Sequence, residues 1–191
     1  VEGREIGEIW GLQTIGIAKS EEEMQAHLSS LPKGGQEAIG SKWSAGDIMY
    51  RDLNGDGKIS KGASTLDDHG DLKVIGNSTP RYFFGIDLNA DWKGFDVRLF
   101  FQGVMKRDYW GKDNFCGYLF GARGDKDMWH ARGLVEHQDY FRAQAIGIDG
   151  HELPANLDAY YPRPVFKEGA KNQETQSRYL QDASYIRLKN F

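Results

Sequence analysis

Apolar and polar residues alternate along two neighbouring stretches of the chain, residues 82–92 and 95–105. In the first stretch every second residue belongs to a largely apolar set: Tyr82, Phe84, Ile86, Leu88, Ala90 and Trp92. After Lys93 and Gly94 the alternation resumes with a second such set: Phe95, Val97, Leu99, Phe101 and Gly103. Successive side chains of a strand face opposite sides. The pattern therefore predicts a β-hairpin with one apolar face and one largely polar face.

The length of the predicted strands admits two interpretations. Each arm runs for at least about ten residues, which is long enough for a tilted strand to cross the hydrocarbon core of a membrane. Trp92 and Phe95 flank the turn, where an interfacial aromatic belt would lie. The alternative is a hairpin of a soluble β-sandwich or barrel, whose strands are usually about five or six residues long. The pattern alone leaves both interpretations open.

Composition removes several other classes of protein. No run approaches the roughly 18 apolar residues of a membrane-spanning helix. A net charge of −4 and the lack of a basic stripe argue against a nucleic-acid partner. The single cysteine, Cys116, cannot form an intrachain disulfide. The chain begins at Val1 without a signal segment and stops within a strand-like run, so we expect a piece of a longer protein.

The lengths of the connections favour a membrane barrel. Strands are expected at about 1–13, 80–92, 95–106 and 179–191, joined by long segments at about 14–79 and 107–178. A short helix is expected after Ser20, which forms a capping box with Glu23. Outer-membrane barrels alternate short periplasmic turns with long extracellular loops, whereas soluble domains rarely carry such long connections. We therefore predict an all-β fold, namely an antiparallel transmembrane β-barrel segment with long extracellular loops carrying short helices.

A calcium-loop pattern lies within the first long connection. Oxygen-bearing side chains stand at positions 1, 3 and 5 of a possible Ca²⁺ loop, which are Asp52, Asn54 and Asp56. Gly57 at position 6 permits the sharp turn, and the carbonyl oxygen of Lys58 serves at position 7. Position 12 is Ala63, which cannot bind a metal. A further carboxylate must therefore come from later residues, and the candidates are Asp67, Asp68 and Asp71. A solvated turn rich in Asp and Asn is the alternative.

The long connections are also rich in aromatic residues. Sugar rings stack on aromatic faces, so four residues are candidate substrate platforms: Trp110, Trp129, Tyr160 and Tyr161. The more ordinary interpretation, which we favour, is that these rings pack the loops against one another. The five histidines are scattered without metal-ligand spacing, and no carboxylate pair stands out as a catalytic acid and base. The sequence thus predicts no enzyme.

Taken in order along the chain, these motifs resemble the SusC/RagA family of TonB-linked outer-membrane proteins of Bacteroidetes. The resemblance rests on several segments and covers nearly the whole chain. They are the glycines at 3, 7 and 11, the acidic helix after Ser20, residues 46–59, residues 74–82, the hairpin at 84–103, Tyr161-Pro162-Arg163 and residues 179–190.

The resemblance implies a role and a metal ligand. Such proteins are large barrels, plugged at the N-terminus, that import glycans or peptides across the outer membrane with a SusD-like surface lipoprotein as lid and TonB as energy source. This chain would supply a few strands near the C-terminal end of the barrel. The family usually places an Asp before a run ending in Ile-Ile-Gly, and Asp71 precedes Val74-Ile75-Gly76 here after an insertion. Asp71 is thus the expected fourth side-chain ligand. A soluble, calcium-stapled β-domain that binds carbohydrate remains the alternative.

Overall fold

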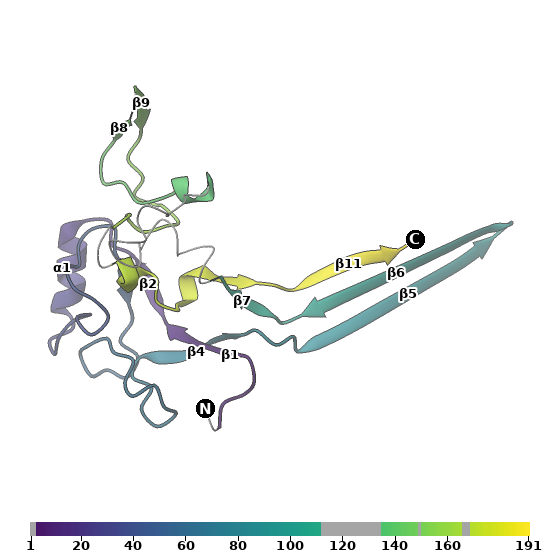
Figure 1. Cartoon of the computed structure of the whole chain (residues 1–191), viewed down its shortest axis with the longest axis horizontal. Helices are drawn as coiled ribbons and strands as arrows, with labels where there is room; N and C mark the ends of the chain where they lie inside the picture. The colour runs from purple at the N-terminus through teal and green to yellow at the C-terminus, as the bar shows by residue number, and fades with distance from the viewer. Residues whose placement is uncertain (1–2, 112–134, 149, 166–168) are drawn as a thin grey trace, which may run out of the picture.

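The computed structural model describes residues 3–111, 135–148, 150–165 and 169–191. Figure 1 shows two parts, a folded region of short strands, helical segments and loops, and a long sheet that projects from it. We call the first part the head; it comprises the described residues of 8–77, 108–111 and 135–182. The hairpin and the C-terminal strand form the projecting sheet.

The predicted hairpin is confirmed. Strand β5 (Tyr82–Trp92) pairs antiparallel with β6 (Phe95–Met105) in an unbroken register from Tyr82↔Met105 to Trp92↔Phe95. Both turn residues have a positive φ, 49° at Lys93 and 86° at Gly94. Two such residues give the turn that matches the right-handed twist of the flanking strands, which fixes the register.

The C-terminal strand is split into two. Residues Tyr185–Asn190 form β11, which pairs with β6 and gives the sheet order β11-β6-β5. Residues Leu180–Asp182 form β10, which pairs with β7 (Asp108–Trp110) in the head. The break at 183–184 separates what the alternation predicted as one strand.

Three chain segments pass directly from the head into the projecting sheet. Strand β4 (Leu72–Asn77) leads into β5, β6 leads into β7, and β10 leads into β11. Between the head and the projecting sheet these segments remain hydrogen-bonded to one another. Arg81 N donates to Lys106 O at 3.4 Å, and Ala183 N donates to Arg107 O at 2.8 Å. We call this line, residues 78–81, 106–107 and 183–184, the junction.

The first predicted strand and the first long connection differ from the expectation. Strand β1 (Glu8–Leu12) begins several residues later than predicted, and it pairs antiparallel with β4, a strand inside the segment expected to be a loop. Strands β2 (Thr14–Ile17) and β3 (Ile48–Tyr50) pair in the same way. Residues 14–79 therefore contain the strands β2, β3 and β4 of the head.

The predicted helix is confirmed as α1 (Glu21–Ser29). The hydroxyl of Ser20 accepts from Glu23 N at 3.2 Å, as a capping residue should. The Glu23 carboxylate accepts a hydrogen bond from Lys19 N at 2.7 Å, one residue before the capping residue. In the described residues, none of the helices has the length and apolar character needed to cross a membrane.

The remaining elements of the head are short. They are the β8 and β9 hairpin (Ile146–Ile148 and His151–Leu153) and the 3-10 turns η2 (Val135–Gln138), η3 (Gly169–Asn172) and η4 (Ser177–Tyr179). The core of the head gathers fully buried side chains from distant segments: Leu12, Ala18, Met24, Ile48, Tyr50 and Ile59. The described residues form mostly sheets with few helices, which agrees with an all-β fold. No sheet among them closes on itself.

Candidate functional site

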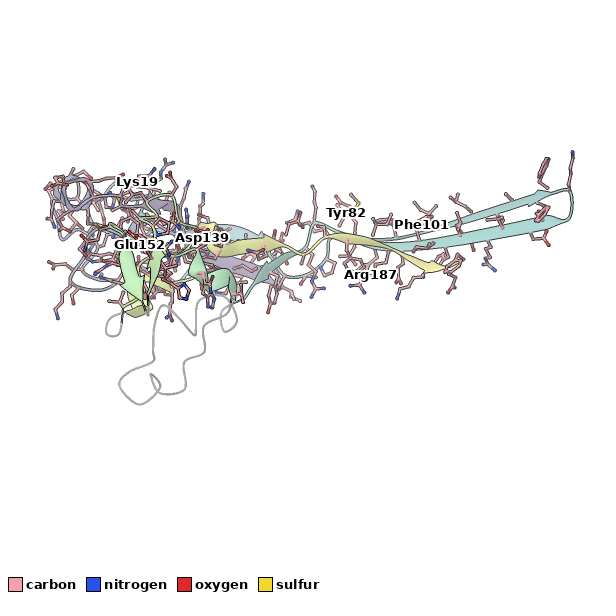
Figure 2. All side chains as sticks on the ribbon, turned by 90° about the horizontal axis from the view of Figure 1, so that it is seen from above. Lys19, Tyr82, Phe101, Asp139, Glu152 and Arg187 are labelled. Carbon is pink, nitrogen blue, oxygen red and sulfur yellow. The ribbon has the colours of Figure 1, made fainter. Side chains whose placement is uncertain are left out.

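The projecting sheet presents one continuous apolar face. Residues directly opposite each other in a sheet share a face, and the register pairs Ile86 with Phe101 and Leu88 with Leu99. Strand β11 adds Leu188, opposite Phe101, and Ile186, opposite Gly103. Figure 2 shows side chains standing off the sheet along its whole length, beyond the head.

The apolar face has no cover in the described structure. Large side chains on it are exposed by 43% to 71%: Tyr82, Ile86, Leu88, Trp92, Phe95, Val97, Met105, Ile186 and Leu188. An apolar patch of this extent marks contact with a partner or with a membrane. Each arm has 11 residues, which at about 3.3 Å per residue and a tilt near 45° spans a hydrocarbon core of about 25 Å.

The opposite face of the sheet is mostly polar. Arg98 donates through Nε to Asp87 Oδ1 at 3.1 Å and through Nη2 to Asp87 Oδ2 at 2.5 Å. Asn89 lies opposite Arg98 in the register, and Asp91 lies opposite Asp96. This face can meet water, whereas the apolar face requires an apolar environment.

Side-chain oxygens of the possible calcium loop accept hydrogen bonds from backbone N–H groups of the same loop. Asp52 accepts from Gly55 N at 2.6 Å and from Gly57 N at 2.8 Å, and Asn54 Oδ1 accepts from Asp56 N at 2.9 Å. Gly57 has a φ of 82°, as expected for the sharp turn. Ile59, which follows Lys58 at position 8 of the loop, is fully buried, and its N–H bonds to Gly35 O at 2.7 Å. Side-chain oxygens therefore line the inside of a tight turn.

Asp71 reaches this loop across the insertion. It is fully buried, its Oδ1 accepts from Leu53 N at 2.7 Å, and its Oδ2 accepts from Ser60 N at 2.8 Å. The backbone of Asp71 also bonds to Ser60 O at 2.8 Å, so the intervening residues bulge outward without displacing it. Asp68, by contrast, bonds to Ala63 N at 3.0 Å within the insertion. Of the two side chains, Asp71 alone joins the two ends of the loop.

The structure does not by itself assemble a metal centre. Over the described ranges, no three His, Cys, Asp or Glu side chains are gathered closely enough to hold an ion. The donor types of the loop nevertheless suit Ca²⁺, which takes carboxylate, amide and backbone carbonyl oxygens in flexible geometry.

The predicted aromatic platforms are placed differently from one another. Tyr161 is only 3% exposed and packs against Tyr179, with ring centroids 5.8 Å apart, and against Tyr160 at 4.9 Å. Tyr160 and Trp110 are half-buried at the edge of the same core. Packing, the interpretation favoured from sequence, thus describes the position of Tyr161. Trp129 lies outside the described residues.

A buried ionic cluster that was not predicted from the sequence links the two long connections. The carboxylate of Asp47 accepts from Arg163 Nε at 3.0 Å, Lys171 Nζ at 2.8 Å and Asn172 Nδ2 at 2.9 Å. Asp47 and Lys171 are both almost fully buried. Burial raises the pKa of Asp47, but the bonds from Arg163, Lys171 and Asn172 outweigh this and hold that pKa below its ordinary value. The cluster ties residues near β3 to η3, more than one hundred positions along the chain.

Comparison with known proteins finds a relative that aligns with nearly the whole chain. The chain is 27% identical over 192 aligned residues to TonB-dependent receptor P3 of Formosa agariphila. That protein is a TonB-dependent receptor. The alignment takes in 99% of this chain and 15% of the relative, so the chain spans about a seventh of the length of the protein it matches. No protein-family model matches the chain. Residues 1–191 thus resemble, along their whole length, a stretch of such a receptor.

Proposed function

We propose that this chain is part of an outer-membrane TonB-dependent importer of glycans or oligopeptides. The observation that carries the proposal is the projecting sheet, whose 11-residue strands expose one continuous apolar face and one polar face. In a barrel wall the first face meets lipid and the second lines the lumen. Similarity to a TonB-dependent receptor along the whole chain supports the same role.

Under this proposal, each part of the chain has an expected location relative to the outer membrane. The turn at Lys93 and Gly94 faces the periplasm, and the head lies outside the cell. There the head is positioned to contact a SusD-like surface lipoprotein and the substrate, while TonB acts through other parts of the receptor. Tyr160 and Trp110, which are partly exposed, are the candidate platforms for a substrate, and stacking on a sugar ring is the chemistry they offer.

Calcium binding by residues 52–71 is a second part of the proposal. The ion would be held by five groups: the side chains of Asp52, Asn54, Asp56 and Asp71 and the carbonyl oxygen of Lys58. Its role would be to fix the loop to the rest of the head. The support is the bonding of Asp71 to both ends of the loop, together with the oxygen-rich donor set. Since a metal that binds only the folded state stabilises it, Ca²⁺ should raise the melting temperature of the head.

A soluble, calcium-stapled β-domain that binds carbohydrate is the other candidate. The head has its own buried core, which favours that alternative. The soluble alternative, however, does not explain the apolar face of the projecting sheet. An exposed face of this kind would promote aggregation in water.

The test uses the full-length parent, extracted from membranes with a mild detergent. We expect the protein in the outer-membrane fraction, together with a stoichiometric surface lipoprotein and a bound oligosaccharide or peptide. Recovery of the intact parent in the aqueous phase without detergent would reject the importer and favour the soluble alternative.

A variant with Asp52 and Asp56 both replaced by alanine tests the calcium site. It should lose the Ca²⁺-dependent rise in melting temperature, and an unchanged response would reject the site.

A further inference from the structure

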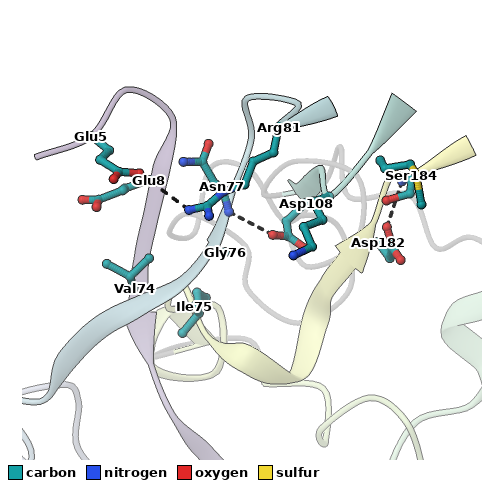
Figure 3. A pocket seen from close by; sticks show the side chains of 12 residues that line it. Glu5, Glu8, Val74, Ile75, Gly76, Asn77, Arg81, Asp108, Asp182 and Ser184 are labelled. Atoms are coloured by element: carbon teal, nitrogen blue, oxygen red, sulfur yellow. Dashed lines mark hydrogen bonds and ion pairs between the residues drawn. The ribbon is translucent and has the colours of Figure 1, made fainter. Parts of the chain in front are cut away.

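A short ladder in the head places a tyrosine next to a glutamine. Strands β7 and β10 pair with Tyr109 directly opposite Gln181. Because residues directly opposite each other in a sheet share a face, these two side chains lie side by side. The neighbouring pair, Asp108 and Asp182, faces the other way, and both residues line the cavity drawn in Figure 3. Tyr109 and Gln181 therefore lie on a face of the ladder that carries neither of those carboxylates.

A second tyrosine joins this face. The Nε2 atom of Gln181 donates to the hydroxyl oxygen of Tyr160 at 3.3 Å, so Gln181 contacts a tyrosine on either side. Tyr109 is 46% exposed, and Tyr160 and Gln181 are half-buried. We call these three residues the tyrosine cluster. Trp110 lies opposite Leu180 and faces the other side of the ladder. The aromatic side chain that shares a face with Gln181 is thus Tyr109, which was not among the predicted platforms.

Neighbouring side chains hold Tyr160 in place. Its ring packs edge-on against Tyr161 and Tyr179, with ring centroids 4.9 Å and 5.3 Å apart. Arg178 donates from Nε to Tyr160 O and from Nη2 to Ala159 O, both at 2.9 Å, so these guanidinium groups are engaged by backbone carbonyls. A side chain that is fixed before a ligand arrives loses little conformational entropy on binding. Tyr160 is therefore suited to hold a ligand group in one position.

The polar atoms of the tyrosine cluster have hydrogen-bonding capacity that the protein leaves unused. Among the bonds between described residues, neither tyrosine hydroxyl donates to a protein acceptor, and Gln181 Oε1 accepts from no protein donor. A hydroxyl can donate and accept, and an amide oxygen accepts. None of the three side chains is charged at neutral pH. The cluster thus offers the exposed ring of Tyr109 together with uncharged donors and acceptors.

We propose that the tyrosine cluster is a subsite for a neutral sugar ring of the substrate, with Tyr109 as the stacking platform. The inference rests on the proposed function, which places the head outside the cell and gives glycans or oligopeptides as cargo. A pyranose ring presents a face of C–H groups, which matches the ring of Tyr109. Its hydroxyls donate and accept, which matches the hydroxyl of Tyr160 and the amide of Gln181. The charged ends of a peptide would find no charged partner among these three side chains, so the cluster favours a glycan.

The experiment uses the full-length protein purified from outer membranes in a mild detergent. Isothermal titration calorimetry with neutral oligosaccharides of glucose, galactose, mannose and xylose identifies the best binder, which is then titrated into variants. Tyr109→Ala should weaken its binding by about tenfold, because the stacking surface is lost. Tyr109→Phe keeps the ring and should retain most of the affinity. Tyr160→Phe removes one hydroxyl and should weaken binding by about threefold.

Two further variants serve as controls. Tyr82→Ala removes a tyrosine of the projecting sheet that is 55% exposed, and it should bind the oligosaccharide as the wild type does. Tyr109→Leu keeps apolar bulk without an aromatic ring. It gives the same comparison with Tyr109→Phe if Tyr109→Ala is not recovered from the outer membrane.

Three outcomes would overturn the inference. They are equal affinity of the wild type and the variants without a ring at position 109, no binding of any neutral oligosaccharide, and tighter binding of tripeptides or acidic oligosaccharides than of neutral ones. If one of these is found for a protein that fractionates with the outer membrane, only this inference fails. If the full-length protein does not reach the outer membrane at all, the proposed function fails.

Discussion

Replacing Asp47 with alanine should destabilise the head by about 3–5 kcal/mol, the usual effect of removing one partner of a buried ion pair. The structure gives the reason. Asp47 accepts bonds from Arg163, Lys171 and Asn172 at 2.8–3.0 Å, and from Ser44 N at 3.0 Å. Without the carboxylate, the ammonium group of Lys171 loses its anionic partner. It keeps the carbonyl oxygens of Ser41 and Lys42 and the Trp43 ring, 4.8 Å from Nζ, in a site that is 1% exposed.

Hydrogen exchange on the full-length protein measures this effect locally. The amide of Ile48 bonds to Asn172 Oδ1 at 3.0 Å, and that of Tyr50 bonds to Gln36 Oε1 at 2.6 Å, so both report opening of the head. Since each 1.4 kcal/mol is a factor of ten, their protection should fall by about 100- to 4,000-fold.

Two further variants make the prediction sharp. Adding Lys171→Met to Asp47→Ala removes the unpaired charge, so the double variant should be more protected than Asp47→Ala alone. The matched control is Asp158→Ala, which breaks the exposed pair with Lys19 and should leave the protection of the head amides nearly unchanged. If Asp47→Ala proves no more damaging than Asp158→Ala, or if Lys171→Met gives no recovery, the cluster does not hold the head together.

Three other predictions use different features of the chain. Replacing Ile86 with Asp on the apolar face should oppose outer-membrane assembly of the full-length protein by about 2 kcal/mol, whereas Asn89→Asp on the polar face should not; equal assembly would mean that Ile86 does not meet lipid. Asp71→Asn should weaken Ca²⁺-dependent thermal stabilisation and Asp68→Asn should not, as read by melting curves with calcium or chelator; the reverse order would assign the ligand to Asp68. Because the pKa of Asp47 is lowered in the folded state, its contribution is fully present above its ordinary pKa near 4 and is lost as pH falls below that value. Amide protection of the head should therefore show no change from this group between pH 5 and 8 and a decline in more acidic solution, and a loss centred near pH 6 would contradict the assignment.

The features that were predictable from sequence are the local ones. The β5–β6 hairpin follows from strict alternation and a two-residue turn, and α1 follows from Ser20 and Glu23, all within a few positions of one another. Asp71 was marked by its place before Val74-Ile75-Gly76, and the structure does bring its side chain to the loop.

What the sequence did not reveal depends on contacts between distant segments. Strand β4 was hidden because its pairing with β1 joins residues 60 to 69 positions apart, and its own pattern is short. The Asp47 cluster joins residues separated by 116 to 125 positions, and nothing in the neighbourhood of Asp47 distinguishes it from a surface acid. The break that splits β10 from β11 reflects the junction, where the chain changes from a projecting sheet to a folded head.

The most direct test of a barrel wall is the alternation of environment along β5 in the membrane. Spin labels placed one at a time at Ile86, Asp87, Leu88 and Asn89 of the full-length protein, with Cys116 replaced, can be probed with oxygen and with a water-soluble nickel chelate. We predict that labels at Ile86 and Leu88 collide mainly with oxygen, which concentrates in lipid, and that labels at Asp87 and Asn89 collide mainly with the chelate. Equal access of the chelate to all four positions would show that no face of this sheet meets lipid, and would contradict the account.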